Sequence, residues 1–496
     1  MAQPRVVVVG AGFGGIGLAG RLLADGVDVT VVEKAGGVGG TWRANTYPGA
    51  ACDIPSHLYS LSFAPKDDWS RVYAPQPEIL AHLEEVTDRL GVRPHLRLRT
   101  EVLGATWDAA ACSWAVELSD GTTLECEVLV PATGQLNRPL VPRIEGLEDF
   151  PGPVVHSARW DHEVDLDGAR VAVVGTGASA MQFVPPVADR AGSLVLFQRT
   201  PPWVLGRWDR RFSALEQAAL AHVPGLRAAY RAGIWAWKEA TWPVFVEGSL
   251  ANRALQGVLD LRLAQRVRDR GLRQRLRPDF APGCKRVLAS NQWYATLQRD
   301  HVEVVDADLA RVEGRTLVAG DGSRHEVDVV LLATGFRATE MLTPMRITGR
   351  DGRDLQQHWA DGAEAFLGMQ VHGFPNLFLL YGPNTNLAHN SIIHMLESQM
   401  AYVQDAVARI GAGRADAFDV RDDVQDTFNR TLDEDLERLV WDTGCTSWYL
   451  TGDGRNTNNW PRTTLAYRRR TRRLHPAEHE VLRRTAEPGR TARIGA

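Results

Sequence analysis

Two glycine-rich segments contain the residue types that could bind the phosphates of dinucleotides. The first reads Gly10-Ala-Gly12-Phe13-Gly-Gly15, and the second reads Gly175-Thr176-Gly177-Ala-Ser179-Ala180. In such a segment the first glycine permits a tight turn and the second lets the backbone approach a pyrophosphate, while a small third residue allows a helix to pack closely on a strand. One such segment is often only a turn, but two copies in one chain predict two dinucleotide sites.

The residues that follow each segment predict which dinucleotide it binds. Glu33 stands 18 residues after Gly15, where a carboxylate binds the hydroxyl groups of an adenosine ribose. This site is therefore predicted to bind FAD, with NAD as the alternative. Arg199, followed by Thr200, holds the comparable position after the second segment, where a guanidinium would pair with the 2′-phosphate of NADPH. A solvated charge at a strand end stays open as the alternative for Arg199, because 52 of the 56 basic residues are arginines.

Both segments lie in the sequence pattern of a strand, a helix and a second strand. The first unit covers residues 6–9, 16–25 and 27–32, and the second unit runs from a strand at 171–174 to a strand at 194–197. Two further apolar strands, at 128–134 and 329–335, each end in Ala-Thr-Gly. The pattern predicts an α/β fold with two Rossmann-like dinucleotide-binding domains.

A third motif lies between the two units. Phe150-Pro-Gly152-Pro-Val-Val-His156-Ser-Ala-Arg-Trp160-Asp161 matches the fingerprint F-x-G-x-x-x-H-x-x-x-W-(P/D) at every defined position. On this motif and the two glycine segments, the chain resembles the type I Baeyer–Villiger monooxygenases over most of its length. The related N- and S-oxygenating flavin monooxygenases typically end the motif in Phe or Tyr, so Trp160 favours the Baeyer–Villiger branch. The resemblance implies that His156 positions the linker between the domains and transfers no proton.

The resemblance also implies an activity and two catalytic residues. The expected reaction uses FAD and NADPH to insert one oxygen atom of O2 next to a ketone carbonyl, giving an ester or lactone through a C4a-peroxyflavin. Pro282-Gly-Cys-Lys285-Arg286 resembles the stretch that supplies the catalytic arginine, and Asp53 corresponds to its carboxylate partner. A fixed cation would stabilise the peroxide anion and the tetrahedral adduct, and arginine suits this role because it keeps its proton. An incidental surface ion pair is the alternative for Asp53 and Arg286.

Further residues are expected to contact the cofactors. The turn from Gly36 to Trp42 looks like the flavin-contacting turn of the family, and Lys285 would join Arg199 at the 2′-phosphate. Trp448, which follows Ser447, is expected to contact the nicotinamide ribose or the substrate, with a packed core tryptophan as the alternative. The full set of predicted cofactor-binding residues is Gly10, Gly12, Phe13, Gly15, Glu33, Lys34, Gly40, Thr41, Trp42, Asp53, Tyr59, Val102, Gly175, Thr176, Gly177, Ser179, Ala180, Gln182, Arg199, Thr200, Lys285 and Trp448.

Three other classes of protein compete with this interpretation. An N- or S-oxygenating monooxygenase would need no arginine beside its flavin, so Arg286 and Trp160 argue against it. A pyridine nucleotide–disulfide reductase shares the double dinucleotide fold but uses a C-x-x-C pair. The five cysteines form no such pair and no cluster with metal-ligand spacing, which argues against a redox-active disulfide, a structural zinc and a secreted disulfide scaffold. A non-enzymatic FAD- and NADP-binding module is the remaining alternative.

The charge balance and the hydrophobic pattern indicate which kinds of binding partner to expect. Sixty acidic and 56 basic residues in 496 leave a net charge of −4, which gives no reason to expect nucleic acid or a membrane surface as a partner. No apolar run approaches the roughly 18 residues of a membrane span. The chain begins directly with a predicted strand, so no signal peptide is expected and the expected location is the cytoplasm. The expected partners are a ketone and O2, and the sequence specifies neither the ketone nor the oligomeric state.

The same patterns predict the domain boundaries. Residues 1–140 and 380–496 are expected to form the FAD-binding domain, and residues 150–207 and 279–342 the NADPH-binding domain. A helical insertion is expected at 208–278, with helices at 214–221, 226–237 and 250–275. Most of the tryptophans in and near it are expected to pack in the core. The arginine-rich tail, 468–496, is expected to fray, because it lacks clear periodicity.

Overall fold

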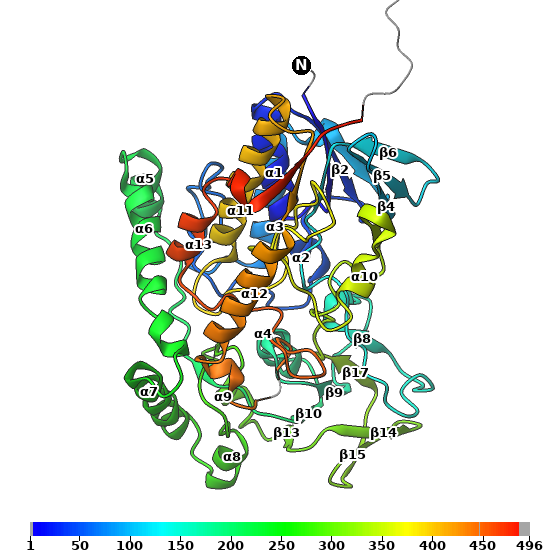
Figure 1. Cartoon of the computed structure of the whole chain (residues 1–496). Helices are drawn as coiled ribbons and strands as arrows, with labels where there is room; N and C mark the ends of the chain where they lie inside the picture. The colour runs from blue at the N-terminus through cyan, green and yellow to red at the C-terminus, as the bar shows by residue number, and fades with distance from the viewer. Residues whose placement is uncertain (1–2, 446, 486–496) are drawn as a thin grey trace, which may run out of the picture.

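Two parallel sheets form the centres of the two dinucleotide-binding units, and they lie at opposite ends of the molecule (Figure 1). The computed structural model describes residues 3–445 and 447–485. The first sheet has the order β3 (Leu96–Leu98), β2 (Asp28–Glu33), β1 (Arg5–Val9) and β7 (Val128–Pro131). The second has the order β13 (Val302–Val305), β10 (Ser193–Phe197), β9 (Arg170–Val174), β17 (Val329–Leu332) and β8 (Val154–His156). All neighbours in both sheets are parallel, so the predicted α/β fold with two Rossmann-like units is confirmed.

A glycine-rich helix face brings the C-terminal half of the chain back to the first sheet. Helix α1 (Phe13–Ala24) follows β1, and α11 (Ile392–Gly411) lies alongside it (Figure 1). A Cβ atom at Gly17 would come within 2.6 Å of the Met400 side chain, and one at Gly14 would come within 3.3 Å of Leu396. Side chains larger than hydrogen would therefore separate the two helices.

Smaller elements extend each unit. An antiparallel sheet of β4 (Val102–Asp108), β5 (Ser113–Leu118) and β6 (Thr123–Cys126) adds β18 (Arg346–Thr348) in parallel. A second one consists of β14 (Leu309–Glu313), β15 (Thr316–Ala319) and β16 (Arg324–Glu326). A short parallel pair consists of β11 (Val204–Leu205) and β12 (Leu288–Ala289). Further helices in these regions are α2 (Thr41–Ala44), α3 (Gln76–Arg89), α4 (Ala178–Ala188), α9 (Trp293–Thr296), α10 (Leu355–His358) and α12 (Asp422–Leu436).

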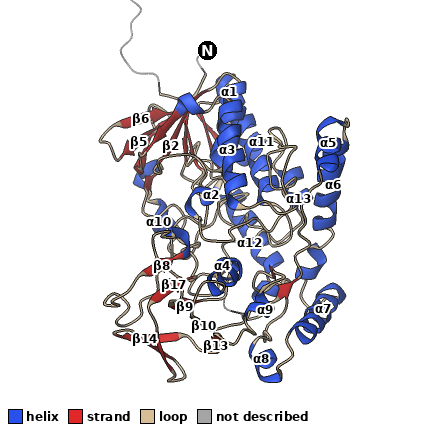
Figure 2. Cartoon of the chain, turned by 180° about the vertical axis from the view of Figure 1, so that it is seen from behind, coloured by secondary structure: helices blue, strands red, loops and turns tan. Residues whose placement is uncertain are grey.

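The helical insertion lies along one side of the molecule, as the view from behind also shows (Figure 2). It contains α5 (Ala214–His222), α6 (Leu226–Glu239), α7 (Leu250–Arg266) and α8 (Arg270–Arg275). The predicted helices are thus confirmed, except that the single helix expected over 250–275 is wrong. The chain leaves the helical conformation at Val267, and the Asp269 carboxylate accepts a hydrogen bond from the Leu272 N–H and caps a new helix.

The prediction of a frayed tail is wrong for residues 468–485. Helix α13 (Thr464–Arg470) is followed by β20 (His479–Leu482), which pairs antiparallel with β19 (Ala417–Val420). Side chains of the tail are buried despite its arginine-rich composition, because Thr471 and Leu474 are almost fully buried and His479 is 6% exposed. Residues 486–496 lie outside the described residues.

The structure also contains a disulfide that the sequence did not predict. Cys284 and Cys445, which are 161 residues apart in sequence, form a disulfide with a Cα–Cα distance of 6.4 Å. The missing C-x-x-C pair gave no indication of it, because only the fold brings these two residues together. Cys52, Cys112 and Cys126 are buried free thiols. Among the described residues, no helix has both the length and the apolar composition needed to cross a membrane.

Candidate active site

The first glycine segment forms a turn whose geometry requires glycine. Gly10 has a φ of +107°, and a Cβ atom there would lie 2.7 Å from the Ala132 carbonyl oxygen. A Cβ atom at Gly15 would lie 1.9 Å from the Gly10 oxygen. Gly12 caps the start of α1, and the nearest atom to a Cβ there is Gly40 Cα at 3.8 Å. The N–H groups at the start of α1 are therefore open to an anion such as the pyrophosphate of FAD.

Glu33 is fixed at the end of β2 beside this turn. Its carboxylate accepts hydrogen bonds from the N–H groups of Ala11 at 2.8 Å and Ala35 at 2.7 Å, one on each oxygen. A carboxylate has about four lone-pair sites, so each oxygen keeps room for a ribose hydroxyl. Lys34 is exposed next to it. The residues at this turn therefore fit the adenosine end of FAD.

The predicted flavin-contacting turn lies against the same glycines. Gly39 N–H donates to the Ala11 oxygen at 2.9 Å, and Trp42 Nε1 donates to the Tyr59 hydroxyl at 3.1 Å. Thr41 is exposed at the start of α2. Phe13 and Val102 are both buried in hydrophobic clusters, at 6% and 5% exposure, so a ligand can contact them mainly through their backbone. The structure thus brings most of the predicted FAD residues together.

The second glycine segment has the same open geometry. A Cβ atom at Gly175, whose φ is +104°, would lie 2.7 Å from the Ala333 oxygen, whereas one at Gly177 would meet nothing within 4 Å. Thr176 Oγ1 donates to the Thr200 carbonyl oxygen at 2.9 Å, which holds the end of β10 beside the turn. The start of α4 is therefore also open to a pyrophosphate.

Other residues predicted to bind the cofactor at this segment contact the rest of the protein. Ala180 is fully buried, as the third position of the motif requires for close packing, and Ser179 is half-buried. Gln182 Nε2 donates to the Ala51 oxygen at 2.9 Å, and its own oxygen accepts from the Ala51 N–H at 3.2 Å. Gln182 thus connects α4 with the loop that carries Asp53, and its cofactor contact stays a prediction.

Arg199 and Lys285 lie near each other at the end of β10. Among the described residues, neither forms an ion pair with an acidic side chain. Burial lowers the pKa of Lys285 and the neighbouring charge of Arg199 lowers it further, and together they outweigh the opposite effect of Asp279. The Lys285 ammonium also lies 5.0 Å from the centre of the Phe280 ring. Two cations held side by side repel each other, and a dianion such as the 2′-phosphate of NADPH would relieve this repulsion.

Asp53 and Arg286 form an ion pair between two distant parts of the chain. Arg286 donates from Nε at 2.9 Å and from Nη2 at 2.6 Å, both to Asp53 Oδ2. The Arg286 side chain is 28% exposed, and the Asp53 side chain is 35% exposed. Burial by itself raises the pKa of Asp53, but the charge and hydrogen bonds of Arg286 outweigh it and the pKa is lowered. The negative charge of Asp53 in turn raises the pKa of Arg286. Both groups stay charged, and Arg286 keeps its Nη1 donors for another partner.

The sequence interpretation missed four side chains around this pair. Arg207 Nη2 donates to the Cys52 oxygen at 2.9 Å. Lys238, on α6 of the insertion, contributes a positive charge that also lowers the pKa of Asp53. Tyr381 and Tyr449 lie near Arg286, and burial raises the pKa of the Tyr449 hydroxyl to about 12. The rarity of lysine, with only four in the chain, was the one signal that could have singled out Lys238.

Three of the five tryptophans in and near the insertion pack as expected, because Trp203 is buried and Trp235 and Trp242 lie against hydrophobic clusters. Trp208 and Trp237 are 78% and 47% exposed, and their rings stack with centroids 6.2 Å apart. Trp448 is 39% exposed and lies against Tyr449, so the alternative of a packed core tryptophan is wrong for it. His156 is buried, and its Nδ1 accepts a hydrogen bond from the Ala158 N–H at 3.1 Å, which suits a structural role.

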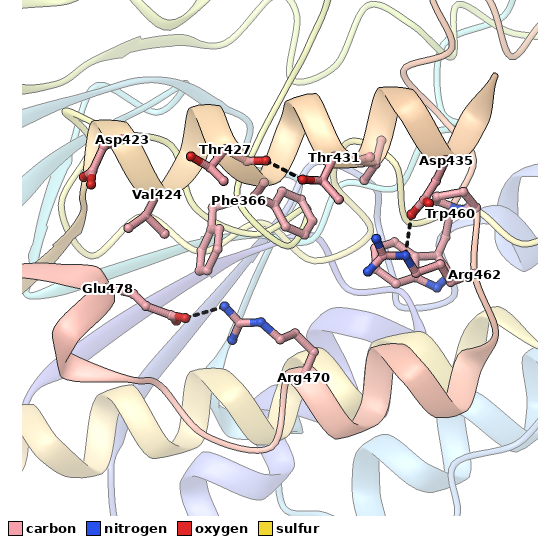
Figure 3. Close-up of a pocket in the computed structure, with 13 residues that line it drawn as sticks. Phe366, Asp423, Val424, Thr427, Thr431, Asp435, Trp460, Arg462, Arg470 and Glu478 are labelled. Atoms are coloured by element: carbon pink, nitrogen blue, oxygen red, sulfur yellow. Dashed lines mark hydrogen bonds and ion pairs between the residues drawn. The ribbon is translucent and has the colours of Figure 1, made fainter. Parts of the chain in front are cut away.

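A separate groove lies between α12 and the segment around α13 (Figure 3). The ion pair between Arg462 and Asp435 of α12 crosses it, whereas Arg470 pairs with Glu478 within the segment around α13. Neither Asp53 nor Arg286 lines this groove, so it is not part of the site described above.

Known proteins with the same architecture include several oxygenases. The family described as pyridine nucleotide-disulphide oxidoreductase matches residues 4–241. A Baeyer-Villiger monooxygenase of Streptomyces coelicolor is 45% identical over 97% of this chain and 93% of its own length. Another, of Pseudomonas aeruginosa, is 39% identical over 96% of this chain and 91% of its own length.

Solved structures agree with these relatives. An oxidized steroid monooxygenase bound to NADP superimposes with a TM-score of 0.85 at 31% identity, covering 94% of this chain and 97% of that one. Cyclohexanone monooxygenase from Rhodococcus sp. Phi1 bound to NADP+ superimposes with a TM-score of 0.85 at 27% identity, covering 95% and 97%. These likenesses favour oxygenation of ketones over the N- and S-oxygenating alternative. The chain belongs to the Baeyer–Villiger monooxygenases, a family of NADPH-dependent flavoproteins.

Proposed function

We propose that this protein inserts one atom of O2 next to the carbonyl of a ketone and releases an ester or lactone, with Arg286 as the residue that stabilises the negative charge of the reaction. The observation that carries this proposal is the Asp53–Arg286 pair, in which a charged arginine is fixed by two hydrogen bonds to one carboxylate oxygen. FAD, once reduced by NADPH, supplies the chemistry that activates O2.

Arg286 stabilises an anion without protonating it. Because its pKa is raised, the guanidinium keeps its protons and acts only as a hydrogen-bond donor. Asp53 holds the Nε edge, which leaves Nη1 to donate toward an oxyanion formed from the ketone oxygen. A donor fixed before the reaction needs no reorganisation as negative charge develops.

The two turns and their neighbours bind the cofactors under this proposal. The open start of α1 and the Glu33 carboxylate hold FAD, while the open start of α4 holds the pyrophosphate of NADPH. Arg199 and Lys285 hold the 2′-phosphate. Trp448 contacts the nicotinamide ribose or the ketone. Lys285 and Arg286 are adjacent, so binding of the coenzyme and positioning of the catalytic arginine are connected through one loop.

The variant Arg286→Ala tests the role of the arginine. We expect NADPH to reduce the bound FAD at a rate close to that of the wild type, while ester formation falls by about 100- to 1000-fold, the usual effect of removing one donor to an oxyanion. Flavin reduction is measured by anaerobic stopped-flow absorbance, and ester by mass spectrometry on linear, cyclic and aryl ketones. Arg277→Ala is the matched control, since Arg277 forms an exposed ion pair with Asp260. Wild-type ester formation by Arg286→Ala would refute the assignment.

A further inference from the structure

The disulfide joins two loops that both reach the site. Cys284 directly precedes Lys285 and Arg286, and Cys445 lies three residues before Trp448. Cys284 is fully buried, and Thr443 Oγ1 lies 3.7 Å from its sulfur. The bond therefore connects the arginine loop directly with the segment that carries Trp448.

The arginine loop has several other attachments. Asn252 Nδ2 donates to the Pro282 oxygen at 2.7 Å, and Trp441 Nε1 donates to the Gly283 oxygen at 3.0 Å. Just before the loop, Trp203 Nε1 donates to the Phe280 oxygen at 2.8 Å. Together with the two hydrogen bonds to Asp53, these contacts fix Arg286 without help from the disulfide.

The Trp448 segment has fewer attachments. In the described parts of residues 443–448, the polar contacts with the rest of the protein are the disulfide, the hydrogen bonds of Thr443, one of 3.2 Å from the Leu450 N–H to the Ser447 oxygen, and one of 3.5 Å from Asn458 Nδ2 to the Trp448 oxygen. The Trp448 ring also packs on the ring of the neighbouring Tyr449. The hydrogen bond of Ser447 Oγ is to the nearby Tyr449 N–H. Loss of the disulfide would thus release mainly the Trp448 segment and would leave Arg286 in place.

We infer that Cys284 and Cys445 are positioning residues whose disulfide holds Trp448 ready for the coenzyme. This inference rests on the proposed function, because Trp448 faces NADPH only under that proposal. A dithiol reductant supplies two electrons and two protons, which convert the disulfide to two thiols while the reductant becomes a disulfide. The freed segment must then be ordered each time the coenzyme binds, so reduction weakens coenzyme binding and leaves the chemistry of Arg286 largely unchanged.

A thiol count tests the bond itself without any activity. The full-length FAD-bound protein is denatured under non-reducing conditions and titrated with a thiol reagent. We expect three free thiols, those of Cys52, Cys112 and Cys126, and all five cysteines after reduction. Five thiols without reductant would overturn the inference.

Coenzyme binding tests the positioning role. We expect the Kd of NADP+, measured by isothermal titration calorimetry, to rise by about 3- to 10-fold on reduction, the effect of ordering one or two additional side chains. The KM for NADPH should rise similarly, while kcat stays within about 2-fold, because only binding is affected. Calorimetry needs no turnover, so it can be read even if ketone oxidation fails.

Three variants complete the test. Cys445→Ser should bind NADP+ with the raised Kd even without reductant, and the dithiol should not change that Kd. Cys284→Ser should behave in the same way if it folds. Cys126→Ser is the matched control, because it removes a buried thiol and keeps the disulfide. An unchanged Kd on reduction, or an equal rise in Cys126→Ser, would show that the disulfide does not position Trp448.

Discussion

Asp53 receives positive charge from three different segments. Arg286 pairs with it directly, Arg207 is bonded to the adjacent Cys52 oxygen, and Lys238 approaches from α6. Asp209 lies 4.0 Å from Arg207 and also pairs with Arg71. Asp53 and Asp209 together do not neutralise Arg286, Arg207 and Lys238, so the site has an excess of positive charge where the proposed reaction develops negative charge. Since Arg286 is fixed by Asp53, the field of Arg207 and Lys238 acts mainly by keeping Asp53 ionised and in place.

Arg199 provides a prediction about coenzyme choice. We expect Arg199→Ala to raise the KM for NADPH by about 10- to 100-fold, the loss of one or two charge-assisted hydrogen bonds, and to change the KM for NADH little. Steady-state oxidation of both coenzymes measures the difference. Arg190→Ala is the control, because Arg190 pairs with Asp167 on the surface of the same unit. Equal effects on both coenzymes would reject a 2′-phosphate role.

At the scale of elements, the sequence pattern predicts the range of α6 and does not predict which residues α6 packs against. Its helical range could be predicted, because periodicity and helix propensity are local properties. The glycine turns could be predicted for the same reason, since the strand, turn and helix are consecutive. Which side of α6 faces Asp53 depends on how the insertion docks, and so Lys238 was missed. The Cys284–Cys445 pair and the β19–β20 pairing join distant segments, and no local pattern indicates them.

Glu239 docks α6 onto the first unit. Its carboxylate accepts hydrogen bonds from Asn390 Nδ2 and Thr464 Oγ1, both at 2.8 Å, and from the Leu465 N–H at 3.2 Å. His389 Nε2 lies 3.4 Å away. Burial alone would raise the pKa of Glu239, but these partners lower it to about 2. The carboxylate therefore contributes stability that is fully present above its ordinary pKa of 4.5 and is lost as the pH falls toward 2.

The variant Glu239→Gln tests this docking. We expect it to lower the free energy of unfolding by about 2–4 kcal/mol at pH 7, and the difference from the wild type should shrink as the pH falls below 4.5. Urea unfolding followed by tryptophan fluorescence, from pH 7 to pH 3, measures the difference. Glu247→Gln, an exposed position of the insertion, should behave as the wild type. A difference that does not depend on pH would contradict the assigned role of the carboxylate.

At the scale of the whole molecule, the proposed catalytic pair spans two units. Asp53 precedes the second strand-turn-helix unit, whereas Arg286 follows the insertion, 233 residues later. Any rotation of one unit against the other would change the distance between them. We therefore expect the chain segments that connect the two units to permit only motions that keep this pair together during oxygen transfer. The domain boundaries given above stay a prediction.

The two ends of the described chain meet at one buried carboxylate. Glu127, with a side chain 10% exposed, accepts hydrogen bonds from the Arg5 N–H at 2.8 Å and from Arg484 Nη2 at 3.0 Å. This contact fixes the segment after β20 against the start of β1. The segment is remote in sequence from every predicted cofactor residue except Trp448, so its contribution should be to stability.

Glu127→Gln should therefore separate stability from catalysis. We expect it to lower the free energy of unfolding by about 1–3 kcal/mol, because charge-assisted hydrogen bonds to both arginines are weakened. The KM for NADPH and the ester product should not change. Glu125→Gln is the control, since Glu125 is 71% exposed and lies 3.8 Å from the Arg5 guanidinium, and it should cost less than about 0.5 kcal/mol. Thermal unfolding of the FAD-bound protein distinguishes the two variants, and equal losses in both would mean that burial of Glu127 contributes nothing to joining the two ends.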